Sequence, residues 1–255
     1  MKDLQILFKL NHFYRKFGVL GLVKKVISAL LYRIKTKIFT FKLVRSKLSN
    51  KEKFTAIFYK TLSESTESVS GVGSSLEYTS NLRKKLPYMF AQFKIKSVFD
   101  APCGDFNWMK EVILTNDISY LGTDIVSEIV NQNISNYSAK NISFLEGDLT
   151  KISFPKSDLM ILRDILFHLS YNDARKVIHN FLKSEIKFLL TTTHTQCNQN
   201  SDIYSGDFKF INLYKHPYNF PNKPLWVVDD WIPPFPQRKM VLFSREQLIE
   251  NKVFE

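Results

Sequence analysis

Carboxylates follow a series of short apolar segments from residue 95 onward in this 255-residue chain. Asp100 ends the first segment, Asp124 ends the second, and Asp148 and Asp164 follow the third and fourth. If these segments are neighbouring parallel strands, their carboxyl ends meet at one edge of a sheet, where doubly wound folds bind ligands. An acid after the second strand can accept hydrogen bonds from both hydroxyls of a ribose, and one after the third can accept from an adenine amino group. The pattern therefore predicts a site for a nucleoside-type ligand.

A tight turn follows Asp100 in the segment 102–108, which contains Gly104. Because glycine has no Cβ, the backbone of this turn can approach a bound ligand closely. The segment lacks the Gly-x-Gly-x-x-Gly pattern with which dinucleotide sites hold a pyrophosphate, and this argues against a nicotinamide-dependent oxidoreductase. Cys103 has no basic neighbour in the sequence that would activate its thiol, so we interpret it as a small buried residue and not as a nucleophile.

Further polar groups follow the fourth and fifth apolar segments. Arg163 and Asp164 come directly after the fourth, His168 lies four residues further on, and His194 ends the fifth. A histidine, with an ordinary pKa of about 6.5, is suited to remove the proton of a hydroxyl acceptor, so His168 is our first candidate for a general base. Asp164 would orient that histidine or take the proton itself, and His194 is a second base candidate. In the structural alternative, Asp164 caps the following helix and His168 packs inside its first turn.

The segments that must position these groups alternate between strand and helix patterns. Short apolar runs predict strands at 95–101, 119–124, 142–146, 158–162 and 187–193. Helical patterns lie between them at 108–114, 127–136 and 171–182. This alternation predicts an α/β fold with a doubly wound, mostly parallel sheet and helices on both of its faces. Two β-like runs at 226–230 and 239–243, joined by a proline-rich link, predict a closing hairpin that adds an antiparallel C-terminal strand.

Helices are expected to precede this sheet. Residues 51–94 contain two helical patterns separated by a Gly/Ser loop at 70–75, and we interpret them as a helical cap on the domain formed by residues 95–255. The two helical patterns lie at 53–62 and 76–93.

The charge of the chain is concentrated at its N-terminus. The net charge is +12, and residues 1–50 carry twelve Lys or Arg against one acid, Asp3, so that +11 resides there. Apolar residues recur at helical spacing from Val19 to Phe41, which predicts a basic amphipathic helical extension. Such a helix packs on the domain, lies on an anionic membrane surface or binds a phosphate backbone, and all three interpretations stay open.

The composition excludes several classes of protein. Hydrophobic residues make up 44% of the chain, which is enough for a core and excludes wholesale disorder. No run of about 18 apolar residues exists, so a bilayer-spanning helix is not expected. Cys103 and Cys197 are the only cysteines, and the five histidines lack metal-ligand spacing, so neither a disulfide framework nor a metal site is predicted. The N-terminus lacks a secretory pattern, and we therefore expect a cytoplasmic protein.

A long polar and aromatic segment at 198–224 precedes the closing hairpin. Its amide, hydroxyl and aromatic groups, which include Asn198, Asn212 and Tyr218, suit the binding of a polyhydroxylated acceptor. Shielding of the sheet edge is the alternative role. On the opposite side of the site, we expect Tyr78 and the Gly/Ser loop to close over the ligands.

Three motifs resemble those of a bacterial subgroup of the class I S-adenosylmethionine-dependent methyltransferases. They are SGVGSSLEYT at 70–79, DAPCGDFNW at 100–108 and RDILFHL at 163–169. The similarity runs from about residue 51 to the end and does not cover the basic segment. It implies a Rossmann-like sheet of seven strands and S-adenosyl-L-methionine as the cofactor. Members of the subgroup are similar to proteins with surface-polysaccharide or glycosyl-transfer functions, which points to sugar-like acceptors.

The family's first-strand pattern, acid-x-Gly-x-Gly-x-Gly, is kept in part. Asp100 and Gly104 match it, whereas Pro102 stands in place of the first glycine and Phe106 in place of the third. A donor without phosphate does not require the close-approach glycine of a dinucleotide site, so the departure is compatible with this cofactor. The expected cofactor-binding residues are Asp100, Pro102, Cys103, Gly104, Asp105, Trp108, Asp124, Ile125, Asp148, Leu149 and Arg163.

These expectations combine into a methyltransferase that methylates an oxygen of a small-molecule or glycan acceptor. His168, Asp164 and His194 are the candidate catalytic residues, and Tyr78, Asn198, Asn212 and Tyr218 are the candidate substrate-binding residues. An RNA methyltransferase is one alternative, motivated by the basic segment but opposed by the neutral body and by the lack of an Asn/Asp-Pro-Pro-Tyr/Phe motif. A non-catalytic module that docks on a membrane or partner is another. For the methyltransferase we also expect peripheral contact with the inner membrane face through residues 1–50.

Overall fold

The computed structural model describes residues 2–62 and 67–254, except for the side chains of residues 2–18, 22, 29, 32 and 33. The chain divides into two compact units, Met1–Ser46 and Lys47–Glu255. The first unit consists of one long helix, α1 (Lys2–Arg45), on which the apolar side chains of Val19, Leu20 and Leu30 are exposed. No helix in the described ranges is long and apolar enough to cross a membrane.

The second unit alternates helices and strands. Its helices are α2 (Asn50–Leu62), η1 (Val72–Ser74), α3 (Ser80–Gln92), α4 (Lys110–Ile113), α5 (Ser127–Tyr137), η2 (Leu166–His168), α6 (Tyr171–Lys183) and α7 (Arg245–Glu250). Its strands are β1 (Ser97–Asp100), β2 (Ser119–Asp124), β3 (Ile142–Glu146), β4 (Leu159–Leu162), β5 (Phe188–His194), β6 (Trp226–Asp229) and β7 (Arg238–Ser244).

The seven strands form one sheet in the order β3-β2-β1-β4-β5-β7-β6. Strands β1 to β5 are parallel, whereas β7 pairs antiparallel with β5 and β6 pairs antiparallel with β7. The predicted doubly wound sheet with an antiparallel C-terminal part is therefore confirmed. The chain turns from one half of the sheet to the other between β1 and β4, and such a switch point opens a crevice at the carboxyl ends of the strands.

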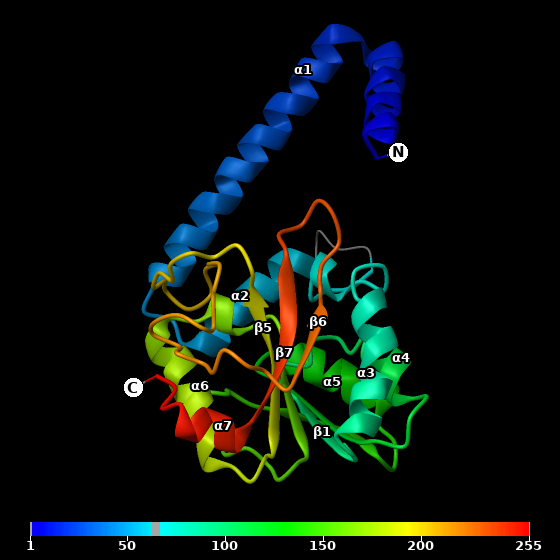
Figure 1. Ribbon diagram of the computed structural model, residues 1–255. Coiled ribbons are helices and arrows are strands. Elements are labelled where there is room, and N and C mark those ends of the chain that lie inside the picture. The colour runs from blue at the N-terminus through cyan, green and yellow to red at the C-terminus, as the bar shows by residue number, and fades with distance from the viewer. Residues whose placement is uncertain (1, 63–66, 255) are drawn as a thin grey trace. The chain divides into compact units, whose positions relative to one another are not determined.

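Helices cover both faces of the sheet, with α6 and α7 on one face and α3, α4 and α5 on the other (Figure 1). The strands β1, β4, β5 and β7 contribute side chains to both cores, because successive residues point to opposite faces. In β4, Met160 and Leu162 pack on the α6 side, and Leu159 and Ile161 pack on the α3 side. Burial on both faces explains why this strand is apolar throughout its length.

Three helices differ from the sequence expectation. The helix predicted at 76–93 begins only at Ser80, because turns occupy the preceding residues. Helix α4 is four residues long and follows Phe106, whose φ of 56° interrupts regular structure. Helix α7 was not expected, although Ser244 and Gln247 form the capping box that marks a helix start in sequence.

Candidate ligand-binding and catalytic site

A cavity of about 490 Å³ lies at the carboxyl ends of β1, β2, β3 and β4. We call it the central cavity. Helix α2, the segment 69–74 and the residues Gly206 and Phe208 complete its wall. The predicted site residues that line it are Asp100, Pro102, Cys103, Gly104, Trp108, Asp124, Ile125, Asp148, Leu149, Arg163, Asp164 and His168. The acids of four successive strand ends therefore share one hollow, at the place where open α/β sheets bind ligands.

The loop after β1 is held in a fixed conformation by β2 and α5. The backbone amides of Gly104 and Val126 donate to opposite oxygens of the Asp124 carboxylate, at 3.1 and 3.0 Å. The side chain of Asn133 donates to the Gly104 carbonyl at 2.7 Å. Gly104 has a φ of 56°, and a Cβ at this position would lie 2.2 Å from the Ser70 hydroxyl. Glycine is required here both for its conformation and for its small size.

Two buried acids of this loop region, Asp100 and Asp124, have pKa values raised toward neutrality. The Asp100 carboxylate accepts a hydrogen bond of 2.7 Å from the Tyr120 hydroxyl. Burial raises the pKa of Asp100 to about 7, against the stabilising effects of that hydrogen bond and of Arg163. Burial also raises the pKa of Asp124 to about 6, against its backbone hydrogen bonds. These carboxylates lack a cation or enough hydrogen-bond donors to offset their burial. A cationic or hydroxyl-bearing ligand would supply such groups, so their environment favours a ligand of that kind.

Residues 67–76 form a strap along one side of the central cavity. Asp105 holds one end of it, because its carboxylate accepts hydrogen bonds from the Val69 amide at 2.8 Å and the Ser70 hydroxyl at 3.2 Å. The other end is held by Asn107, which donates to the Ser74 carbonyl at 3.1 Å. Asp105 was expected to bind the cofactor directly, but the structure places its side chain on the strap and outside the cavity wall.

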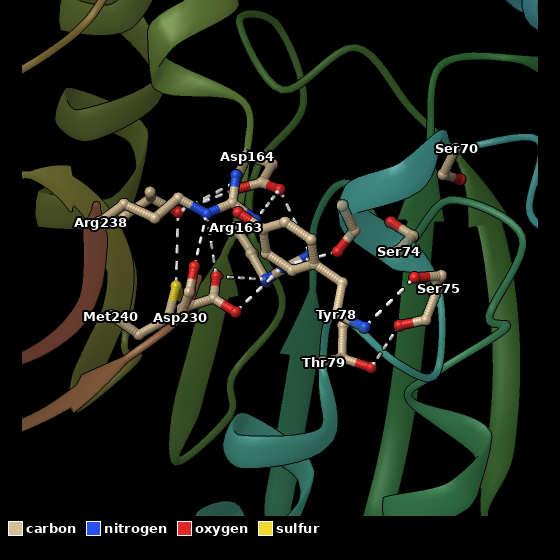
Figure 2. Close-up of polar contacts among 12 residues, drawn as sticks. Ser70, Ser74, Ser75, Tyr78, Thr79, Arg163, Asp164, Asp230, Arg238 and Met240 are labelled. Atoms are coloured by element: carbon tan, nitrogen blue, oxygen red, sulfur yellow. Dashed lines mark hydrogen bonds and ion pairs between the residues drawn. The ribbon is translucent and has the colours of Figure 1, made fainter. Parts of the chain in front are cut away.

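Two arginines and two aspartates form a buried ionic cluster beside the cavity (Figure 2). Arg163 makes a two-pronged contact with Asp230, at 2.9 and 3.1 Å, and also donates to the Gly73 carbonyl of the strap at 2.8 Å. Asp164 lies 3.3 Å from Arg163 and 3.0 Å from Arg238. Burial opposes ionisation of Asp164, but the two guanidinium groups outweigh it and hold the pKa of its carboxyl below the ordinary value.

The two ring nitrogens of His168 differ: Nδ1 contacts a backbone carbonyl, whereas Nε2 makes no hydrogen bond with the residues that the structure describes. Its Nδ1 lies 2.8 Å from the carbonyl oxygen of Asp207. A carbonyl only accepts, so Nδ1 carries the hydrogen and Nε2 keeps a lone pair. Burial lowers the pKa of His168, so the neutral ring predominates at neutral pH. A neutral imidazole with an available Nε2 is the form that a general base requires.

His194 has a different environment from His168. Its ring is packed among Phe167, Phe208 and Phe210, and its Nδ1 accepts a hydrogen bond from the Ile211 amide at 3.3 Å. Burial lowers its pKa to about 4. The structure places this second base candidate behind the cavity wall, where it supports Phe208.

The residues expected to bind the acceptor do not line the central cavity. Tyr218 is fully buried, with its ring packed against Tyr171 and Phe254. Asn212 uses its side chain within the insertion, where it donates to the Cys197 carbonyl at 3.0 Å. Asn198 is exposed on the same insertion, and Tyr78 is buried behind Arg238, whose Cζ lies 4.7 Å from the Tyr78 ring centroid. The polar groups of 198–224 thus largely stabilise their own loop, a use that the composition of the segment does not distinguish from ligand binding.

Several residues of the wall were not identified from the sequence. Phe54 and Phe58 of α2 form an apolar side near Ile125, and their spacing of four residues is the signal that places them on one helix face. Phe208 forms part of the wall near His168. Arg238 begins β7, and no pattern around it in the sequence indicates that it reaches the cavity.

Comparisons with known proteins agree with the fold. Residues 117–187, which run from the turn before β2 to the end of α6 and the turn after it, match the model of the O-methyltransferase domain. A SAM-dependent methyltransferase of Leishmania major is 13% identical with a TM-score of 0.59, over 79% of this chain and 86% of that chain. Magnesium protoporphyrin IX methyltransferase from Synechocystis PCC 6803, with bound SAM, is 12% identical with a TM-score of 0.53, over 79% of this chain and 99% of that chain. The chain has the Rossmann-like fold of these methyltransferases.

Other comparisons add less. Human N-acetylserotonin methyltransferase is 15% identical with a TM-score of 0.48, and the match covers 66% of this chain. The chain spans about half of that enzyme, 52% of its length. The comparison with curated protein sequences finds no significant match.

Proposed function

We propose that this chain is an S-adenosyl-L-methionine-dependent methyltransferase that methylates an oxygen of a small-molecule or glycan acceptor. The observation that carries the proposal is the convergence of Asp100, Asp124 and Asp148 on one cavity at the switch point of the sheet. The O-methyltransferase match of residues 117–187 supports the same reaction, since it includes two of these acids. The resemblance of three sequence motifs to a bacterial methyltransferase subgroup supports it as well.

The strand-end residues fit an adenosyl donor. Each oxygen of Asp124 accepts one backbone hydrogen bond and retains acceptor capacity for a ribose hydroxyl. Asp148 lies at the next strand end, where an adenine amino group would donate, and Phe54 and Phe58 offer an apolar surface to the ring. Asp100 would bind the ammonium group of the methionine portion. The bound donor supplies a methyl group on a sulfonium, which is a good leaving group, so the protein acts mainly by alignment.

His168 is the general base that the geometry favours. Its Nδ1 hydrogen is held by the Asp207 carbonyl, which directs the basic function to Nε2. Asp164 lines the same region, but its carboxylate is shared by two arginines and has a lowered pKa, so it is a poor proton acceptor. We assign to Asp164 the positioning of Arg163 and Arg238 in the cavity wall, and to His168 the removal of a hydroxyl proton.

The alternatives differ from this proposal in what they require. An RNA methyltransferase would use the +11 charge of residues 1–50, but residues 51–255 carry only +1. A docking module without activity would not need an open cavity with four acids at its edge or a histidine with a free Nε2. The proposed acceptor is therefore a small molecule or a glycan, and nucleic acid is disfavoured.

We further propose that residues 1–50 contact an anionic membrane surface. Helix α1 combines exposed apolar side chains, among them Val19, Leu20 and Leu30, with an excess of Lys and Arg. Such a helix buries its apolar side chains at the boundary of the acyl chains while its basic groups attract anionic headgroups. This contact would place the enzyme on the inner face of a membrane.

Binding of the donor should strengthen as the pH rises through neutrality. Below a pH of about 7, Asp100 is protonated and cannot pair with the donor's ammonium group, whereas above it the carboxylate is available. Titration calorimetry with S-adenosylhomocysteine should show an affinity about tenfold higher at pH 8 than at pH 6. Asp100→Asn should bind weakly and with no such dependence. An affinity of the unmodified protein that stays constant over this range would contradict the assignment.

Methyl transfer should depend on His168 and not on a surface histidine. The purified protein is incubated with donor carrying a deuterated methyl group and with separate metabolite, glycan and RNA fractions of a cell extract, and labelled products are identified by mass spectrometry. Label should enter a small molecule or glycan. His168→Asn should reduce the rate by about 100-fold or more, the usual contribution of a general base, while S-adenosylhomocysteine still binds.

The matched control for this experiment is His179→Asn, which changes an exposed residue of α6 and should transfer label normally. Label that enters only RNA, or no fraction at all, would refute the proposed function. Full activity of His168→Asn would refute the base assignment alone.

The full chain should sediment with vesicles that contain phosphatidylglycerol and remain in solution with vesicles of phosphatidylcholine. The double variant Lys24→Glu/Lys25→Glu should lose most of this binding, because each basic group near an anionic surface contributes about 1 kcal/mol. The double variant Lys156→Glu/Lys223→Glu makes the same charge change on the second unit and should bind as the unmodified chain does. Equal sedimentation with both types of vesicle would contradict an electrostatic membrane contact.

A further inference from the structure

Arg238 lies where a ligand in the central cavity would meet it. It begins β7, is paired in register with His194 of β5, and forms part of the cavity wall beside Asp164. Only 8% of its surface is exposed. Its guanidinium carbon Cζ lies 4.7 Å from the centroid of the Tyr78 ring, and Figure 2 shows the guanidinium near this ring. The charge of Arg238 is thus removed from bulk water and held at the edge of the hollow.

One side of this guanidinium is fixed by the protein. The Nε of Arg238 donates to the backbone carbonyl of Asp230 at 2.8 Å. The carboxylate of Asp230 is engaged mainly by Arg163, at 2.9 and 3.1 Å, and lies 3.4 Å from the Arg238 Nε. Arg238 is therefore held on this side by the Asp230 carbonyl and the Tyr78 ring, and only weakly by the Asp230 carboxylate, which pairs mainly with Arg163.

The other side of the guanidinium lacks well-formed hydrogen bonds. Its Nη2 lies 3.0 Å from Asp164, which also contacts Arg163, but this nitrogen is buried and has no acceptor in hydrogen-bond geometry within the described residues. The Nη1 has no acceptor there either. A buried N–H group without an acceptor is costly, and nearly all such groups in folded proteins find a partner.

We propose that Arg238 binds a carboxylate or similar oxyanion of a ligand in the central cavity. The planar guanidinium fork matches the two oxygens of a carboxylate, and charge-assisted hydrogen bonds of this kind are strong in a site removed from water. The ionic cluster itself is neutral, since two arginines face two aspartates, so the ammonium and sulfonium groups of the donor would balance the added negative charge.

Two ligands can carry this oxyanion, and the inference rests on the proposed function for both. The first is the carboxylate of the donor's own methionine portion. The second is a carboxylate on the acceptor, because Arg238 and His168 both line the cavity and the charge of Arg238 contributes to the lowered pKa of His168. In either case Arg238 is a binding residue that positions the donor or the acceptor by holding the carboxylate of that molecule.

The experiment compares S-adenosylhomocysteine with its decarboxylated analogue, which differs only in the carboxylate. Calorimetric titrations use the unmodified full chain, Arg238→Gln and Arg238→Lys. If the donor supplies the oxyanion, loss of the carboxylate should weaken binding to the unmodified chain by about tenfold or more and to Arg238→Gln by less than about twofold. Arg238→Lys, which keeps the charge but not the fork, should lie between them and serves if the Gln variant does not fold.

A second titration tests the acceptor as the source. Benzoate is added to the complexes with S-adenosylhomocysteine. If the acceptor supplies the oxyanion, benzoate should bind the complex of the unmodified chain and not that of Arg238→Gln. S-adenosylhomocysteine and its decarboxylated analogue should then each bind the unmodified chain and Arg238→Gln with the same affinity. The control Lys239→Gln removes a positive charge from the neighbouring residue of β7, whose side chain is half-exposed, and should change neither result.

The outcomes separate this inference from the proposed function. If S-adenosylhomocysteine does not bind the unmodified chain at all, the proposed function fails. If it binds, but Arg238→Gln changes neither the effect of the carboxylate nor the binding of benzoate, the assignment of Arg238 is overturned while the proposed function stands.

Discussion

The buried pairing of Arg163 with Asp230 is the interaction on which the site depends. It joins the end of β4 to the residue that follows β6, and through the Gly73 carbonyl it also secures the strap. Removing one partner of such a pair leaves an uncompensated buried charge, at a cost of about 3–5 kcal/mol. Replacing both partners with apolar groups would preserve stability but not the strap contact. We interpret the pair as a device for positioning parts of the site that are far apart in the sequence.

Burial opposes the ionisation of Asp100, Asp124 and Asp164, but the neighbouring charges make the outcome differ. Asp164 is surrounded by guanidinium groups and has a lowered pKa, which makes it a fixed negative charge in the wall. Asp100 and Asp124 have no comparable cation, and burial raises their pKa values to about 7 and about 6. A cationic donor with hydroxyl groups would relieve both acids. Binding of such a donor would thus offset the energetic cost of burying these two carboxylates in the free protein.

The sequence allowed the sheet and the convergence of the strand-end acids to be predicted because those features are local. Strands β2 and β3 were placed at their observed limits, and strand ends bring Asp100 and Asp124 together whatever the loops do. The contacts of the insertion at 198–224 could not be predicted in the same way. Whether Asn212 or Tyr218 meets a ligand depends on how the insertion folds on itself, and the partnership of Arg163 with Asp230 spans 67 residues. Long-range pairings of this kind have no periodic or turn signal.

The central claim is that the carboxylates at the strand ends hold an adenosyl donor, and a calorimetric titration with S-adenosylhomocysteine tests it most directly. The unmodified protein should bind one equivalent. Asp124→Ala should weaken binding by about 1–3 kcal/mol, the usual cost of leaving hydrogen-bonding groups without a partner. Asp117→Ala, which changes an exposed acid before β2, should leave the dissociation constant unchanged. Absence of binding to the unmodified protein, or equal dissociation constants for it and Asp124→Ala, would contradict the account.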